Sequence, residues 1–255
     1  MKARSTMART GRIMGVIAAL GAALLVGPAP AEASTQNLGA AQGFSAPLRG
    51  PADASSQARP SYNSNGGIWS GYVALISGVK SVSASWTEPA VTCNSAGNVF
   101  GPWVGIGGVL SNSVEQTGVE TNCFSNRPVY RAWYEMAPAP PVYYSNPVGP
   151  GDSISAKVTR VGTSYTVTLS NNTRHWTETV TKSDKGDDAS AEVIVESPIT
   201  AYPNFGKVTF TGAKVDGKPL SSYRPIALDA SNSNGYEDHT GALSGGTFSV
   251  SYRHE

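Results

Sequence analysis

Apolar and polar residues alternate in short runs from about residue 65 onward, and Gly, Pro and Asn separate these runs. The runs are rich in Val, Thr, Ser, Tyr and Trp, which favour strands. Helical periodicity is almost absent. Strands are predicted at 68–73, 79–86, 100–107, 114–120, 129–136, 153–160, 164–171, 176–181, 191–196, 205–214, 227–229 and 247–252, with a hairpin turning at Gly162. Many short strands with regular turn signals predict an all-β fold, either a sandwich or a barrel.

The strand at 191–196 shows the alternation most clearly. Ala191, Val193 and Val195 share one face, which is apolar and belongs on a core. Glu192 and Glu196 lie on the opposite face, where an ordinary solvated strand more often carries Thr or Ser. Taken alone, this strand is best interpreted as having an ordinary solvated face. A second stretch with polar residues on the same face is needed to suggest a catalytic site.

Other strands repeat this contrast between a core face and an unusual second face. Trp103 and Gly105 alternate with core residues in 100–107, and Gln116 lies within 114–120. Trp133 and Glu135 share a face of 129–136 with Arg131. Glycine in a strand often marks the close approach of a ligand or another backbone. Alternation alone leaves two interpretations equally open: a groove for an extended polymer, or a mixed polar and aromatic face in water.

The N-terminal third differs from the rest of the chain. Residues 1–33 combine a basic start, an apolar run at 13–26 and a small-x-small site at Ala31-Glu32-Ala33, which predicts a secretory signal peptide. Residues 34–64, rich in Ala, Ser, Gln, Pro and Gly, are expected to be a propeptide or a disordered linker. Residues 65–255 have the length of one domain. We therefore expect a soluble, secreted, extracellular product.

Charge and cysteine content narrow the possible partners. From residue 65 on there are 13 Lys and Arg against 16 Asp and Glu, a formal charge of −3, and no basic patch suggests nucleic acid. Cys93 and Cys123 are the only cysteines, and in an exported protein we expect a disulfide between them. We expect no metal, no cofactor and no membrane partner, and we expect a monomer.

The sequence lacks the signatures of several classes of hydrolase. None of the histidines, His175, His239 and His254, lies in a recognisable nucleophile elbow, so a Ser–His–Asp site is not supported. There is no HExxH motif for a zinc peptidase and no paired Asp-Thr-Gly motif for a two-aspartate peptidase. A glycosidase using two of the carboxylates Glu120, Glu135, Glu192 and Glu196 stays formally open.

Five motifs in order resemble those of the glutamic peptidases, also called eqolisins, in a secreted member of bacterial type. They are Ile68-Trp69-Ser70-Gly71, Trp103-Val104-Gly105-Ile106-Gly107-Gly108, Gln116-Thr117-Gly118-Val119-Glu120, Ala132-Trp133-Tyr134-Glu135 and Ala191-Glu192-Val193-Ile194-Val195-Glu196. Each motif is modest alone, and the five in this order are specific.

The resemblance implies an all-β sandwich of two curved antiparallel sheets, of the concanavalin-like or jelly-roll type. It also implies a glutamic endopeptidase that hydrolyses peptide bonds in proteins. The catalytic pair would be Gln116 and Glu196. The residues implied for substrate binding are Trp69, Trp103, Trp133, Glu120 and Glu135.

The sequence departs from the family pattern near this site. Gly107 and Arg131 stand where many fungal members carry acids, so we expect an acidic pH optimum that is less extreme than in an acid-rich relative. The alternative function is a non-catalytic, lectin-like or carbohydrate-binding sandwich with Trp103 and Trp133 stacking on sugar rings. Such a platform has no need of Gln116 opposite Glu196.

Overall fold

The computed structural model describes residues 63–109, 111 and 113–255. The predicted signal peptide (1–33) and all but the end of the predicted propeptide or linker (34–64) lie outside the described residues. Within the described part, secondary structure consists of strands and one 3-10 turn, Leu220–Tyr223. No helix in these residues is long and apolar enough to cross a membrane.

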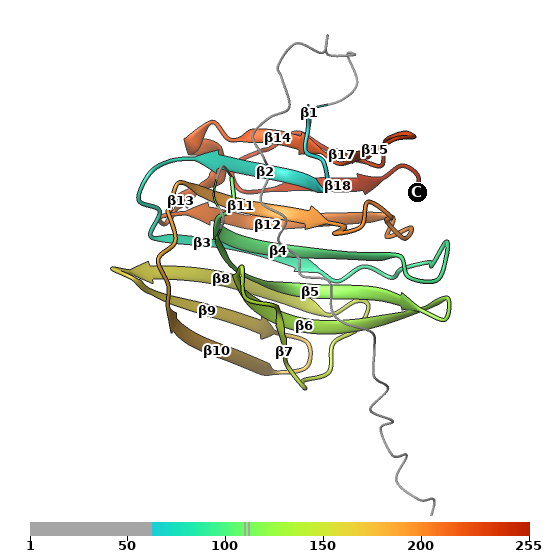
Figure 1. Cartoon of the computed structure of the whole chain (residues 1–255), viewed down its shortest axis with the longest axis horizontal. Coiled ribbons are helices and arrows are strands. Elements are labelled where there is room, and N and C mark those ends of the chain that lie inside the picture. Colours follow the sequence, from blue (N-terminus) through green and yellow to red (C-terminus); the bar gives the residue numbers. More distant parts are fainter. Residues whose placement is uncertain (1–62, 110, 112) are drawn as a thin grey trace, which may run out of the picture. The chain divides into compact units, whose positions relative to one another are not determined.

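The first sheet has eight strands, which can be followed in Figure 1 from β14 through β2, β4 and β5 to β6. Its neighbours pair antiparallel except for the parallel pair β1–β14. In spatial order the strands are β1 (Ser64–Asn65), β14 (Ile226–Asp229), β2 (Trp69–Leu75), β11 (Ser190–Glu196), β4 (Val99–Gly107), β5 (Val114–Phe124), β6 (Arg127–Ala137) and β7 (Val142–Tyr143).

The second sheet is antiparallel throughout its main path. Its strands in spatial order are β10 (Trp176–Ser183), β9 (Ser164–Asn171), β8 (Ser153–Val161), β3 (Ser81–Thr87), β12 (Lys207–Val215), β18 (Phe248–Tyr252) and β17 (Asp238–Thr240). The short strand β13 (Lys218–Pro219) pairs with β12, and β15 (Ser231–Asn232) forms a small separate ribbon with β16 (Gly235–Tyr236).

The main core lies between the two sheets. Alternate residues of each strand point into it, as strand geometry requires. On β11 these are Ala191, Val193 and Val195, and on β4 they include Val104 and Ile106. The second sheet contributes its own alternate apolar residues, such as those of β8 and β12. The predicted sandwich of two antiparallel sheets, and the predicted core faces of 100–107 and 191–196, are confirmed.

A second apolar cluster covers the other face of the first sheet. It contains Trp69, Trp103, Trp133, Ile194 and six further residues: Val73, Val99, Val109, Val114, Ala137 and Leu228. This cluster, which we call the outer cluster, is separate from the main core. The first sheet is therefore covered on both faces, and the side chains beside the outer cluster include the predicted site residues.

All the predicted strands are present, with small differences at their ends. The largest difference is in β5 and β6, which together extend to a two-residue turn at Ser125 and Asn126. Both residues have positive φ (49° and 59°), as the tight hairpin turn that matches strand twist requires. The predicted hairpin at Gly162 joins β8 to β9. The predicted disulfide between Cys93 and Cys123 is also present.

Candidate active site

The three predicted groove tryptophans lie together on the outer face of the first sheet. Trp69, Trp103 and Trp133 come from β2, β4 and β6, and each is fully buried. Trp69 and Trp103 pack edge to face, with ring centroids 5.2 Å apart. No ring of the three is exposed in the manner of a sugar-stacking platform.

Gly118 on β5 makes room for these rings. It pairs with Trp103 on one side and with Trp133 on the other. A Cβ atom at this position would lie 2.3 Å from the Pro102 carbonyl oxygen and 2.7 Å from the Trp103 Cβ atom. The neighbouring backbone cannot give way by so much, so only glycine fits here.

Glu196 ends β11 between Trp69 of β2 and Gly101 of β4. Its carboxyl is fully buried, and Oε2 accepts a hydrogen bond of 2.9 Å from Trp103 Nε1. Burial raises the pKa of Glu196 well above its usual value, and the charge of Glu135 raises it further. The Trp69 and Trp103 indoles lower this pKa, although by less than burial raises it.

Gln116 lies near the start of β5, two strands away from β11. It pairs with Gly105 on β4 and with Glu135 on β6. Gln116 Nε2 donates a hydrogen bond of 2.7 Å to Glu135 Oε2, and both side chains are buried. Gln116 Oε1 is buried and has no hydrogen-bond partner among the described residues. The amide carbonyl is therefore desolvated and available.

Gln116 and Glu196 lie on the same face of the sheet, but no hydrogen bond between described atoms joins them directly. The backbone register places Glu192, rather than Glu196, on the line that crosses Gly105 to Gln116. Glu192 and Glu196 are four residues apart, or about 14 Å along the strand. Glu135 interacts with both Gln116 and Glu196. It accepts a hydrogen bond from Gln116, and its charge raises the pKa of Glu196.

Glu120 forms a separate ionic group further along β5. Arg131 NH2 lies 2.5 Å from Glu120 Oε1, and the Tyr143 hydroxyl donates to Glu120 Oε2 over 2.6 Å. The Arg131 guanidinium stacks on the Tyr143 ring, with Cζ 3.8 Å from the ring centroid. The cation thus neutralises a carboxylate on this face, and Tyr143 buries the pair.

Two residues of this face were not among the predicted site residues. Glu192 is fully buried, and burial raises its pKa well above the usual value for glutamate, with Asp187 and Glu115 adding to the effect. Its position in the alternation of 191–196 was a signal for it. Tyr143 lies in the two-residue strand β7, and no periodic pattern in the sequence marks it.

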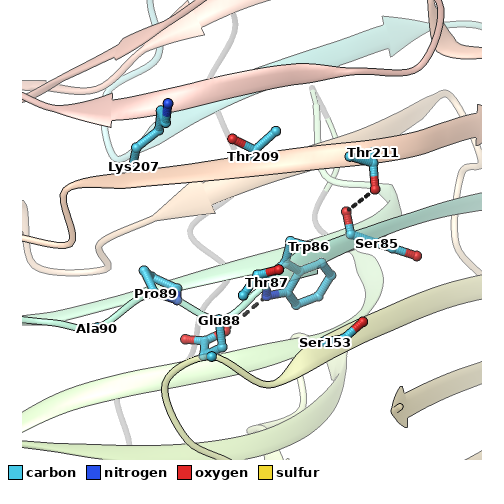
Figure 2. A pocket seen from close by; sticks show the side chains of 11 residues that line it. Ser85, Trp86, Thr87, Glu88, Pro89, Ala90, Ser153, Lys207, Thr209 and Thr211 are labelled. Atoms are coloured by element: carbon cyan, nitrogen blue, oxygen red, sulfur yellow. Dashed lines mark hydrogen bonds between the residues drawn. The ribbon is translucent and has the colours of Figure 1, made fainter. Parts of the chain in front are cut away.

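A cavity of about 620 Å³ lies elsewhere, over the second sheet (Figure 2). Five of its eleven lining residues are Ser or Thr of β3, β8 and β12, and Lys207 also lines it. The buried carboxyl near it, Glu88, accepts hydrogen bonds from Trp86 Nε1 and from the Thr121 hydroxyl. None of the predicted site residues lines this cavity, and the buried carboxyl in its lining, Glu88, already accepts two hydrogen bonds. The cavity is therefore a weaker candidate for the active site than the outer face of the first sheet.

No group of three or more His, Cys, Asp or Glu side chains in the described residues is arranged to hold a metal ion. The groups that can act chemically on the outer face of the first sheet are carboxyls, one amide and the indoles. They can bind, orient and exchange protons with a polar substrate.

Solved structures of glutamic peptidases have folds related to that of this chain. A scytalido-glutamic peptidase with a transition state analog inhibitor has 26% identity and a TM-score of 0.66, covering 74% of this chain and 99% of that one. SCP-B, an eqolisin in complex with the tripeptide Ala-Ile-His, has 25% identity and a TM-score of 0.62 over the same shares. Aspergilloglutamic peptidase from Aspergillus niger has 29% identity and a TM-score of 0.54, covering 61% of this chain and 99% of that one.

A search of curated protein sequences found no match. The model of the Peptidase A4 family matches residues 67–252, which is most of the chain and nearly all of its described part. This match agrees with the five motifs and with the two-sheet architecture. The chain therefore belongs to the Peptidase A4 family and is a peptide-bond hydrolase.

Proposed function

We propose that the protein is an exported glutamic endopeptidase whose catalytic pair is Glu196 and Gln116. The observation that best supports this pair is that both residues lie in motifs of the matched family and on one face of the first sheet. Each also has a buried oxygen, Gln116 Oε1 and Glu196 Oε1, without a hydrogen-bond partner among the described residues, a feature that they share with Glu192 and Glu115. Buried polar atoms are nearly always paired, so these two oxygens can accept hydrogen bonds from water or substrate.

In the first step Glu196 acts as the general base. Its ionised carboxylate takes a proton from a water molecule while the water oxygen bonds to the carbonyl carbon of the substrate. The Trp103 indole holds Oε2 of this carboxylate, which leaves Oε1 for the water. The substrate carbonyl oxygen gains negative charge in this step.

Gln116 stabilises that charge. One N–H of its amide is committed to Glu135, and the other is available to the developing oxyanion. The free carbonyl Oε1 can accept a hydrogen bond from the attacking water and so orient it. In the second step Glu196 passes its proton to the departing nitrogen as the C–N bond breaks.

We infer that an extended peptide lies across the outer face of the first sheet. Trp69, Trp103 and Trp133 are buried there, so they form an apolar floor beneath the peptide rather than an exposed stacking surface. Glu120 contributes to the binding surface as part of its ion pair with Arg131. The substrates are proteins and peptides, and we expect the enzyme to act as a monomer outside the cell, free of nucleic acid and membrane.

The surroundings of Glu196 bear on the working pH. A carboxyl that serves first as base and then as acid works best near its own pKa. Burial raises the pKa of Glu196, which supports an optimum that is acidic but not extreme. Arg131 acts in the opposite direction, because its ion pair with Glu120 removes net negative charge from this face.

The test is digestion of an unfolded protein by the purified, mature enzyme at acidic pH. We expect cleavage that persists with reagents that block serine and cysteine nucleophiles, with chelators, and with inhibitors of two-aspartate peptidases. Loss of activity with any one of these reagents would assign the chemistry to a different class. A preparation that cleaves nothing would contradict the proposed function outright.

A further inference from the structure

Glu135 accepts a side-chain hydrogen bond from Gln116. The two residues face each other directly in the β5–β6 register. Their side chains are buried, and the distance from Gln116 Nε2 to Glu135 Oε2 is 2.7 Å. A charged acceptor in a buried site makes one of the stronger protein hydrogen bonds.

This contact decides which way the Gln116 amide points. The two ends of an amide have nearly the same shape but opposite hydrogen-bonding roles. An ionised carboxylate only accepts, so Glu135 in its ionised form selects the orientation with Nε2 toward itself, which is the orientation in the structure. Gln116 Oε1 is then directed away from Glu135, where it is buried and has no described partner.

We propose that Glu135 is a positioning residue that fixes the orientation of the Gln116 amide, rather than a residue that contacts the substrate. This inference rests on the proposed function and deepens it. It replaces the role in substrate binding that the sequence suggests for Glu135. Glu135 prepares the donor and the acceptor that Gln116 offers to the oxyanion and to the water.

The same carboxylate also acts on Glu196 through its charge. Glu135 raises the pKa of Glu196, whereas the indoles of Trp69 and Trp103 lower it. The other charged or titratable groups of this region are Glu192 on the same strand, Tyr202, and the group Glu120, Arg131 and Tyr143. The pKa of Tyr202 is raised mainly by burial, with Asp238, Glu237 and Glu196 adding to the effect. Removing the charge of Glu135 should therefore lower the pKa of Glu196.

The test compares Glu135→Leu with Glu135→Gln on one peptide substrate. Leu removes the acceptor and the charge, so we expect kcat to fall about 10- to 100-fold, in line with a lost charged hydrogen bond, while KM changes little. Gln keeps an acceptor but no longer selects one orientation, so it should restore part of kcat. In both variants the acid limb of the rate profile should move to lower pH.

Glu115→Gln is the matched control. Glu115 is a buried carboxyl that neighbours Gln116 on β5 but points to the opposite face. We expect this variant to keep the wild-type kcat at acidic pH. Circular dichroism confirms that each variant is folded.

A double variant shows whether Glu135 acts through Gln116. In a Gln116→Ala background, Glu135→Leu should cause little further loss of kcat, because the amide it orients is gone. Additive losses, or a raised KM with unchanged kcat in Glu135→Leu, would overturn the inference and leave the catalytic pair standing. Wild-type kcat in Gln116→Ala itself would instead overturn the proposed function.

Discussion

At Glu196, neighbouring groups act on one carboxyl in opposite directions. Burial and the charge of Glu135 favour the protonated form, whereas the Trp103 indole favours the ionised form. In the proposed mechanism, this balance sets the pH at which Glu196 can change from base to acid. Alternation along β11 is enough to place Glu196 on the outer face, but the sequence does not indicate that an indole on the next strand is its partner.

Trp103→Phe tests this indole contact. Phe keeps an aromatic ring against Trp69 but removes the Nε1 donor, so the pKa of Glu196 should rise. Glu196 must be ionised to accept the first proton, and the acid limb of the rate profile should therefore move to higher pH. The shift is opposite in sign to that expected for the Glu135 variants.

Rate profiles on one peptide, for the wild type and for Trp103→Phe, measure this shift. A limb that stays in place would show that the contact between Trp103 and Glu196 does not tune the base. A shift to lower pH would contradict the direction assigned to the hydrogen bond.

At the scale of the strands, most elements could be predicted because their alternation is long and regular. Both core faces and the unusual second face follow from side-chain direction alone. The strands missed are β1, β7, β13, β15, β16 and β17, each of two or three residues. So short a strand carries no period, and its pairing is decided by tertiary contacts. The parallel pairing of β1 with β14 had no signal in the sequence.

The register between neighbouring strands could not be predicted from the sequence either. The five motifs indicate the candidate site residues, but they do not indicate that Gln116 lies opposite Glu135 and in line with Glu192. Register depends on side chains from several strands packing at once. The role that we propose for Glu135 rests on this pairing, which the sequence does not indicate.

The disulfide could also be predicted from the sequence. It joins Cys93, in the segment before β4, to Cys123 near the end of β5, across a separation of 30 residues. By loop-entropy models a bond of this span contributes roughly 3–4 kcal/mol. It encloses β4 and most of β5, which carry Trp103 and Gln116.

Across the whole domain, several carboxyls are buried in places unrelated to catalysis. Burial raises the pKa of Glu88 and of Glu115 to about 8, and that of Glu237 to about 7. Neither oxygen of Glu115 has a hydrogen-bond partner in the described residues, and nearby Asp184 and Asp188 add repulsion. Such groups bind protons more tightly in the folded chain than in the unfolded one.

The stability of the domain should therefore depend on pH in a defined direction. Below about pH 4.5, the ordinary pKa of glutamate, these carboxyls are protonated in both the folded and the unfolded chain. At such pH they do not destabilise the folded chain. As pH rises toward 8, the unfolded chain releases protons that the folded chain retains, so the free energy of unfolding decreases. We expect the domain to be most stable in acid.

Thermal unfolding across this pH range measures the effect for the wild type and for Glu115→Gln. The variant should lose less stability between acidic and neutral pH, because Gln cannot ionise at this buried position. Equal losses in the two proteins would contradict the assignment of Glu115, and a wild type that gains stability toward pH 8 would contradict the whole-domain account.

The most direct test of the central claim is the rate of cleavage of one peptide by folded Glu196→Gln and Gln116→Ala at the pH optimum of the wild type. Glu196→Gln removes the base and the proton that it carries forward. Gln116→Ala removes the oxyanion donor, a loss that costs about 10²–10³-fold in rate in comparable sites. The account predicts a loss of at least this size in both variants, with native circular dichroism. Near-wild-type cleavage by either folded variant would contradict it.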